Sequence, residues 1–150
     1  MRTVMRLLVL LCFAGAVLAQ APSTQQPSSE VPNLKSVGTM SEIMIDLIFP
    51  TSNEIFYVGR NENKTEKDWE DLRNNALMLA ESANLLMADN RAKDKDRWMK
   101  DANLLRNVGD KAFKFAKVKD LEGLKALNDE LYEACQSCHE HYRPGYRRRL

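Results

Sequence analysis

The sequence predicts an all-α fold, an antiparallel four-helix bundle, on three observations. Apolar residues recur at steps of three and four in four segments, which is the spacing of one face of an α-helix. The connections between these segments are short and polar, and no segment alternates as a half-buried strand would. Finally, stripes of this kind favour the shallow crossing angle of helix bundles. A chain of 150 residues that is 44% hydrophobic suffices for one small domain.

The first helical segment is expected to run from about residue 34 to residue 49. Its apolar stripe consists of Val37, Met40, Met44 and Leu47. Pro50 should end or kink this helix, because proline lacks the backbone N–H that a helix interior needs. Residues 54–58 are expected to add a further turn or two.

The second and third segments carry the most regular stripes. The second opens at Thr65, and Asp68 three residues later completes a capping-box-like pair. Its stripe is Trp69, Leu72, Ala76, Leu79, Ala83 and Leu86. The third stripe is Trp98, Ala102, Leu105, Val108, Ala112 and Phe115, within which Gly109 is a tolerated weak point.

The fourth segment should begin near Asp120, a suitable N-cap residue, and end near Arg143. Pro144 and Gly145 follow, and both residues disfavour helix. The residues that this segment should bury are Leu124, Leu127, Leu131, Cys135, Cys138 and Tyr142.

Both ends of the chain are expected to lie outside the domain of residues 34–143. Residues 1–19 have a basic start, an apolar run and a small-residue cleavage site, so they predict a signal peptide that carries Cys12 away. Residues 20–33 are rich in Ser, Gln and Pro and predict a disordered leader. Residues 144–150 form a basic tail, interpreted either as a solvated terminus or as a docking patch for an acidic partner or an anionic membrane surface. We therefore expect an exported, periplasmic protein.

The charge balance argues against a nucleic-acid partner. Cleavage of the signal would remove two of the 22 Lys and Arg residues, so that 20 remain against 21 Asp and Glu. No basic field of the size that nucleic acids require remains.

The most informative motif is Cys135-Gln136-Ser137-Cys138-His139, because Cys-x-x-Cys-His is the attachment signature of a c-type haem. Cysteines three residues apart lie on one face of a helix, so both sulfurs can reach the two vinyl groups of one porphyrin. His139 follows Cys135 by four residues, which brings its imidazole under the iron as proximal ligand. The motif predicts one haem c, bound covalently through Cys135 and Cys138.

Other interpretations of the motif fit less well. A thioredoxin-like redox disulfide would need a βαβ context, and a zinc site needs about four ligands. A plain disulfide here would close a small loop and stabilise little. Because the two cysteines share an apolar stripe, the haem should lie inside the bundle. Ala76, Ala80 and Ala83 either leave room for it or reflect ordinary close helix packing.

With these residues in place, the chain resembles the class II c-type cytochromes, the cytochrome c prime family, over residues 34–143. The family motif extends as Cys-x-x-Cys-His-x-x-Tyr/Phe-Arg, and Tyr142 and Arg143 match its last two fixed positions. The resemblance implies an antiparallel four-helix bundle with haem attached in the last helix. It also implies that Arg143 lies close to the proximal histidine.

The resemblance further implies that a residue of the first helix lies on the distal side of the iron. In low-spin relatives it is a methionine bound to the metal, and in five-coordinate relatives it is an apolar residue that does not bind. About 6 Å of helix rise separates Met40 from Met44, so only one of them can reach the iron. Met44 is the expected ligand, because the stretch from Met44 to Pro50 is similar to the first helix of low-spin relatives, and Met40 is the alternative. Both could instead be core fillers. His141 lies on another face of the helix from His139 and cannot reach the distal side.

The predicted function is transfer of single electrons between redox partner proteins, with iron bound by His139 and Met44. We expect no enzymatic activity, because no Ser/His/Asp set or phosphate loop can be assembled. One alternative is a five-coordinate protein that binds NO or CO, and another is a haem-free interaction protein with a Cys-x-x-Cys disulfide. Dimerisation through the first two helices is common in the resembled family, and composition neither supports nor excludes it here.

Overall fold

The computed structural model describes residues 35–143 and Gly145. The described residues all belong to one compact unit, which spans residues 33–150. The expected signal peptide, Cys12, the leader and the basic tail apart from Gly145 lie outside the described residues. Within the described part all regular secondary structure is helical, and no helix there is long and apolar enough to cross a membrane.

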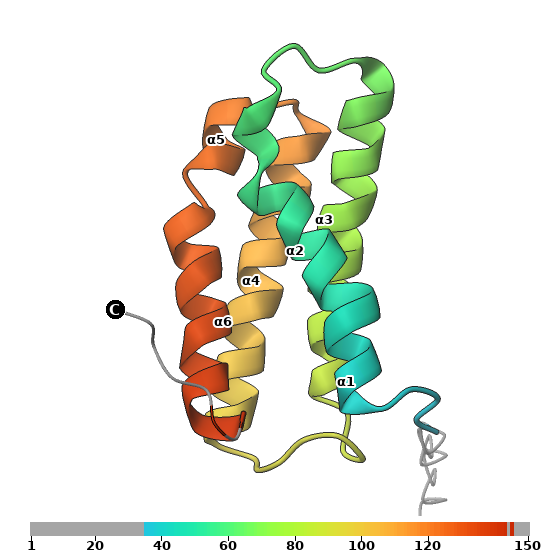
Figure 1. Ribbon diagram of the computed structural model, residues 1–150, viewed down its shortest axis with the longest axis vertical. Coiled ribbons are helices and arrows are strands. Elements are labelled where there is room, and N and C mark those ends of the chain that lie inside the picture. The colour runs from blue at the N-terminus through green and yellow to red at the C-terminus, as the bar shows by residue number, and fades with distance from the viewer. Residues whose placement is uncertain (1–34, 144, 146–150) are drawn as a thin grey trace, which may run out of the picture. The chain divides into compact units, whose positions relative to one another are not determined.

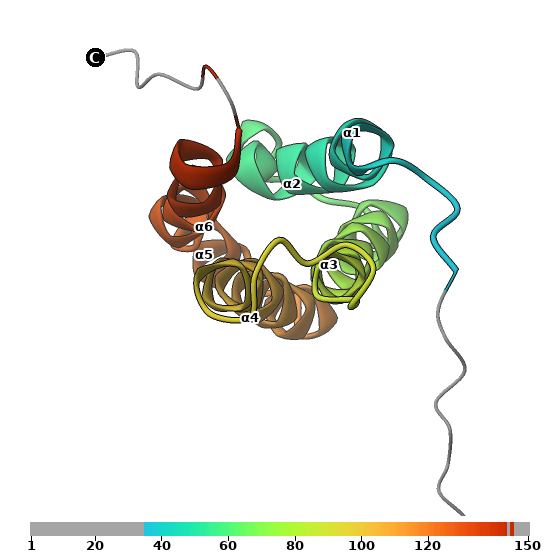
Figure 2. The ribbon, with the colours of Figure 1, turned by 90° about the horizontal axis from the view of Figure 1, so that it is seen from below.

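Four helical segments pack side by side around a common centre (Figures 1 and 2). The elements are α1 (Met40–Glu42), the π-helix η1 (Ile43–Ile48), α2 (Phe49–Phe56), the 3₁₀ turn η2 (Val58–Arg60), α3 (Glu66–Leu86), α4 (Arg97–Lys117), α5 (Leu121–Lys125) and α6 (Asn128–Tyr142). The first segment consists of α1, η1 and α2 in succession, and the fourth consists of α5 and α6. Viewed as in Figure 2, the first segment lies beside α3, α3 beside α4, and α4 beside α6. The expectation of an all-helical bundle is confirmed.

The core lies where the four apolar stripes meet. Its most completely buried large side chains come from all four segments and include Ile55, Leu79, Val108, Leu124 and Leu131. The predicted stripes of the second and third segments are buried, except that their end residues Trp69 and Phe115 are only partly covered. At the start of α3, Thr65 and Asp68 form the expected capping box.

The segments α3 and α4 approach each other closely at Gly109. A methyl group added there would lie 2.7 Å from the backbone nitrogen of Ala80 and 2.9 Å from its Cα. Gly109 is therefore a point of contact between two helix backbones, and α4 runs through it without interruption, as the sequence predicted. Ala76, Ala80 and Ala83 are buried, and Ala80 lies against Gly109.

The first segment starts later than expected. Thr39 caps it, accepting a hydrogen bond from the Glu42 backbone N–H and forming a capping box with the Glu42 side chain. Val37 precedes the helix and is fully exposed, so its assignment to the apolar stripe was wrong. The N-cap residue Thr39, two residues after the first apolar residue of the predicted stripe, decides where this helix begins.

The first segment also continues past Pro50, as far as Phe56, with a change of hydrogen-bond register instead of an end. Residues 43–48 are π-helical, and the N–H of Phe49 donates to the carbonyl of Met44, five residues back. Pro50 has no N–H to donate, so a wider turn before it costs less there than elsewhere. The expected disturbance at Pro50 is present, but it lies on the N-terminal side of the proline.

The fourth segment is interrupted where a continuous helix was expected. Asp120 caps α5 by accepting a hydrogen bond from the Gly123 N–H, as predicted. The N–H of Leu127 then donates to the carbonyl of Leu124, three residues back, which tightens the chain before α6 begins. Both leucines remain buried, so the tight turn keeps two successive apolar residues on the core side. The helix ends at Tyr142 with Arg143 as C-cap, in agreement with the sequence.

Candidate cofactor site

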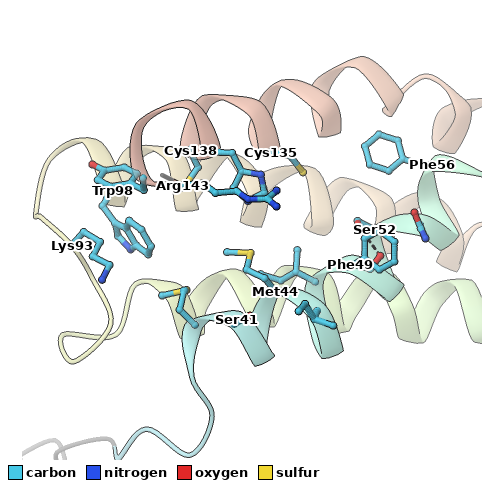
Figure 3. A pocket seen from close by; sticks show the side chains of 16 residues that line it. Ser41, Met44, Phe49, Ser52, Phe56, Lys93, Trp98, Cys135, Cys138 and Arg143 are labelled. Carbon is cyan, nitrogen blue, oxygen red and sulfur yellow. Dashed lines mark hydrogen bonds between the residues drawn. The ribbon is translucent and has the colours of Figure 1, made fainter. Parts of the chain in front are cut away.

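A mostly apolar cavity of about 700 Å³ lies between the first helical segment and α6. Residues of the first segment form one wall and residues of α6 form the opposite wall, while Lys93 and Trp98 close one end (Figure 3). Cavities of about 300–1,000 Å³ are typical of sites that hold small molecules and cofactors. Its walls bring the predicted site residues together.

The α6 wall carries the whole motif on one helix face. Cys135, Cys138, His139 and Tyr142 line the cavity at relative positions i, i+3, i+4 and i+7. Both thiols are free, and the two cysteines are only partly buried because they face the cavity. Their expected burial was therefore overstated.

The thiols are protonated at neutral pH. Burial raises the pKa of Cys135 to about 11, and burial together with the charge of Asp101 raises that of Cys138 to about 11. The pair lies in the interior of α6 and not at its N-terminus, whereas redox-active Cys-x-x-Cys motifs depend on a lowered thiol pKa. This environment disfavours a thioredoxin-like role.

The opposite wall carries both candidate methionines. Met40 and Met44 line the cavity and are partly buried, and Ile48, Ser52 and Phe56 follow along the same wall. Figure 3 shows Met44 pointing into the cavity toward α6, where Cys138 and Arg143 lie. One face of the first segment is thus directed at the motif.

Aromatic packing and one short hydrogen bond close an end of the cavity. The Trp98 ring meets the Tyr142 ring edge to face, with centroids 4.9 Å apart, and its indole N–H donates to the Leu86 carbonyl at 2.7 Å. The Tyr142 hydroxyl donates to the carboxylate of Asp94, which also accepts from the Trp98 backbone N–H at 3.0 Å. Asp94 therefore joins the loop before α4 to the last turn of α6.

The two histidines differ as expected. His139 is partly buried on the cavity wall, and its pKa is lowered by burial and by the charge of Arg143. Arg143 lines the cavity as well, and its backbone N–H donates to the His139 carbonyl at 3.1 Å. His141 is exposed, with its ring 5.8 Å from that of Tyr142, and does not line the cavity.

Sequence reasoning missed a charged cluster behind the motif. Asp101 on α4 is 1% exposed and accepts hydrogen bonds from the Ser137 hydroxyl at 2.8 Å and from Arg97 Nε at 3.1 Å. Its signal in the sequence was an acidic residue three positions after Trp98, at the spacing of the apolar stripe. Asp94 was missed too, because its partner Tyr142 is 48 residues away.

The chemistry of the cavity fits a haem. Two protonated thiols, an imidazole and two thioethers face a space with apolar walls, and Arg143 and Lys93 are cations at its edge. Comparison with known proteins gives no match to a family model, a curated protein or a solved structure.

Proposed function

We propose that this protein is an exported monohaem c-type cytochrome that carries single electrons between redox partner proteins, without enzymatic activity of its own. The observation that carries the proposal is the cavity wall on which Cys135, Cys138 and His139 lie together, opposite Met40 and Met44. The sequence motif and the resemblance to class II c-type cytochromes support the same assignment, and with it an antiparallel order of the four helices.

The residues of α6 would hold the group. The thiols of Cys135 and Cys138 are the attachment points, and the His139 imidazole is the proximal ligand. Tyr142 and Arg143 line the same wall and would contact the group beside its ligand. When bound, haem supplies a one-electron Fe(III)/Fe(II) couple.

The first segment would supply the distal side. A thioether that fills the sixth position raises the reduction potential relative to a harder ligand and leaves no site for a small molecule. We assign this role to Met44, which points into the cavity. Met40 lines the same wall, one turn earlier, and is the alternative ligand.

The first experiment is mass spectrometry of protein exported with cytochrome c maturation machinery. We expect the mass of the polypeptide plus one haem, and its loss when Cys135 and Cys138 are replaced by Ala. The bare polypeptide mass, with the thiols free or joined to each other, would refute the proposal.

The second experiment decides between electron transfer and gas binding. Absorption spectra of the purified ferric protein should show a low-spin, six-coordinate haem. Met44→Leu should convert it to a high-spin form, whereas Met40→Leu should not. Met78→Leu is the matched control, because Met78 is 46% exposed on α3 and does not line the cavity. A high-spin spectrum of the unmodified protein would favour the NO- or CO-binding alternative.

A further inference from the structure

The charged cluster beside the motif consists of Asp101, Arg97 and Ser137, which form hydrogen bonds with one another. Asp101 Oδ2 accepts from Arg97 Nε at 3.1 Å, and Asp101 Oδ1 accepts from the Ser137 hydroxyl at 2.8 Å. Arg97 Nη2 also reaches the Ser137 hydroxyl, at 3.3 Å. Each of these three side chains, two from α4 and one from α6, thus forms a hydrogen bond with both of the others.

The cluster touches the attachment segment at its centre. Ser137 is the residue immediately before Cys138, so its hydroxyl ties the segment between the two cysteines to α4. A buried carboxylate is seldom the most stabilising way to fill such a position, because its charge loses its hydration. Its presence there points to a role other than packing.

The hydrogen bond from Ser137 brings the Asp101 carboxylate next to the residue that precedes Cys138, and Arg97 lies against the same carboxylate. Both charges therefore lie beside the attachment segment. The two groups differ in exposure, since the Arg97 side chain is 45% exposed and that of Asp101 is 1% exposed. Water and salt screen the guanidinium more than the carboxylate, so the negative field prevails on the motif side.

We propose that Asp101 and Arg97 form a charge pair that sets the reduction potential of the group attached at Cys135 and Cys138, and that Ser137 holds this pair against the attachment segment. The inference rests on the proposed function. Adding an electron beside a buried carboxylate is unfavourable, so Asp101 lowers the potential. Arg97 opposes this effect, and the balance between the two charges decides the result.

Redox potentiometry of the haem-loaded variants tests the charge pair. Asp101→Asn should raise the midpoint potential, by a several-fold change in the ferric-to-ferrous ratio. Arg97→Gln should lower it by less, and Arg97→Lys, which keeps the charge, should stay close to the parent. Asp110→Asn is the matched control, because Asp110 lies on the same helix in an exposed pair with Lys114 at 2.7 Å and should not change the potential.

Opposite shifts for the two charge-removing variants support the proposal, and a purely structural role would not produce them. If the variants carry haem, midpoint-potential shifts of the same sign, or shifts no larger than that of Asp110→Asn, would overturn the proposal. A bare polypeptide mass in the parent would instead remove the proposed function, and this inference with it. If Asp101→Asn does not fold, the contrast between Arg97→Gln and Arg97→Lys decides alone.

The role of Ser137 has a readout that needs no redox measurement. In hydrogen exchange of the purified parent and variant, Ser137→Ala should make the backbone amides of residues 135–139 exchange several-fold faster. Unchanged exchange in that segment would contradict the holding role.

Discussion

Replacing Gly109 by alanine tests whether the close approach of α3 and α4 is required by the fold. Alanine in a helix interior is favoured over glycine by about 1 kcal/mol. The new methyl group, however, would lie 2.7 Å from the Ala80 nitrogen and 2.9 Å from its Cα. These are backbone atoms of a packed helix, which cannot turn aside as a side chain can, so the overpacking cost falls in the upper part of its usual range of about 1–3 kcal/mol.

The two effects oppose each other, and the clash should prevail. We expect Gly109→Ala to lower the free energy of unfolding by about 1–2 kcal/mol, the difference between overpacking and helix propensity. Urea unfolding monitored by circular dichroism measures this as a lower midpoint at unchanged slope, because the surface exposed on unfolding stays the same.

A second variant identifies the atoms responsible. Combining Gly109→Ala with Ala80→Gly removes the Ala80 methyl group but leaves the two nearer backbone atoms in place, so the double variant should recover little stability. An unfolding free energy for Gly109→Ala equal to or above that of the parent would refute the close-contact explanation. Full recovery in the double variant would show that side chains, rather than backbones, are in contact.

Three further outcomes are expected. Leu131→Ala should lower the free energy of unfolding by about 2–5 kcal/mol in urea titrations, because Leu131 is fully buried and its loss leaves a cavity. The hydrogen bond from Tyr142 is the main cause of the lowered pKa of Asp94. The stability that this hydrogen bond gives is therefore present above about pH 4 and is lost as the pH falls further. Melting temperatures measured as a function of pH should accordingly fall less in acid for Tyr142→Phe than for the parent. In haem-free protein, iodoacetamide should modify Cys135 and Cys138 far more slowly at pH 8 than it modifies an exposed thiol, and faster as the pH approaches 11, because burial raises both pKa values to about 11.

The helical class and the caps at Thr65 and Asp120 could be predicted because they depend on neighbours in the chain. Thr65 and Asp68 are three residues apart and satisfy each other's backbone and side-chain groups, so the start of α3 is a local event. The motif is local as well, since Cys135, Cys138 and His139 share a face of any helix that contains them.

The boundaries that were wrong depend on competing local signals or on the core. A Thr39 cap overrode the apolar residue Val37 before it. The turn between α5 and α6 breaks a good helical stripe because it keeps Leu124 and Leu127 on the core side. Pro50 signalled a disturbance, but the π-helical turn before it is one of several ways in which a helix can pass a proline.

The sequence by itself determined that the chain forms amphipathic helices and that one of them carries two thiols and an imidazole on a single face. Only the tertiary structure decided that this face lies opposite Met40 and Met44 across a cavity, and that Asp101 accepts a hydrogen bond from the segment between the two cysteines. The physical reason is separation along the chain. Helix caps and stripes arise from contacts within about four residues, whereas Asp101 and Ser137 are 36 residues apart and meet only when α4 packs against α6.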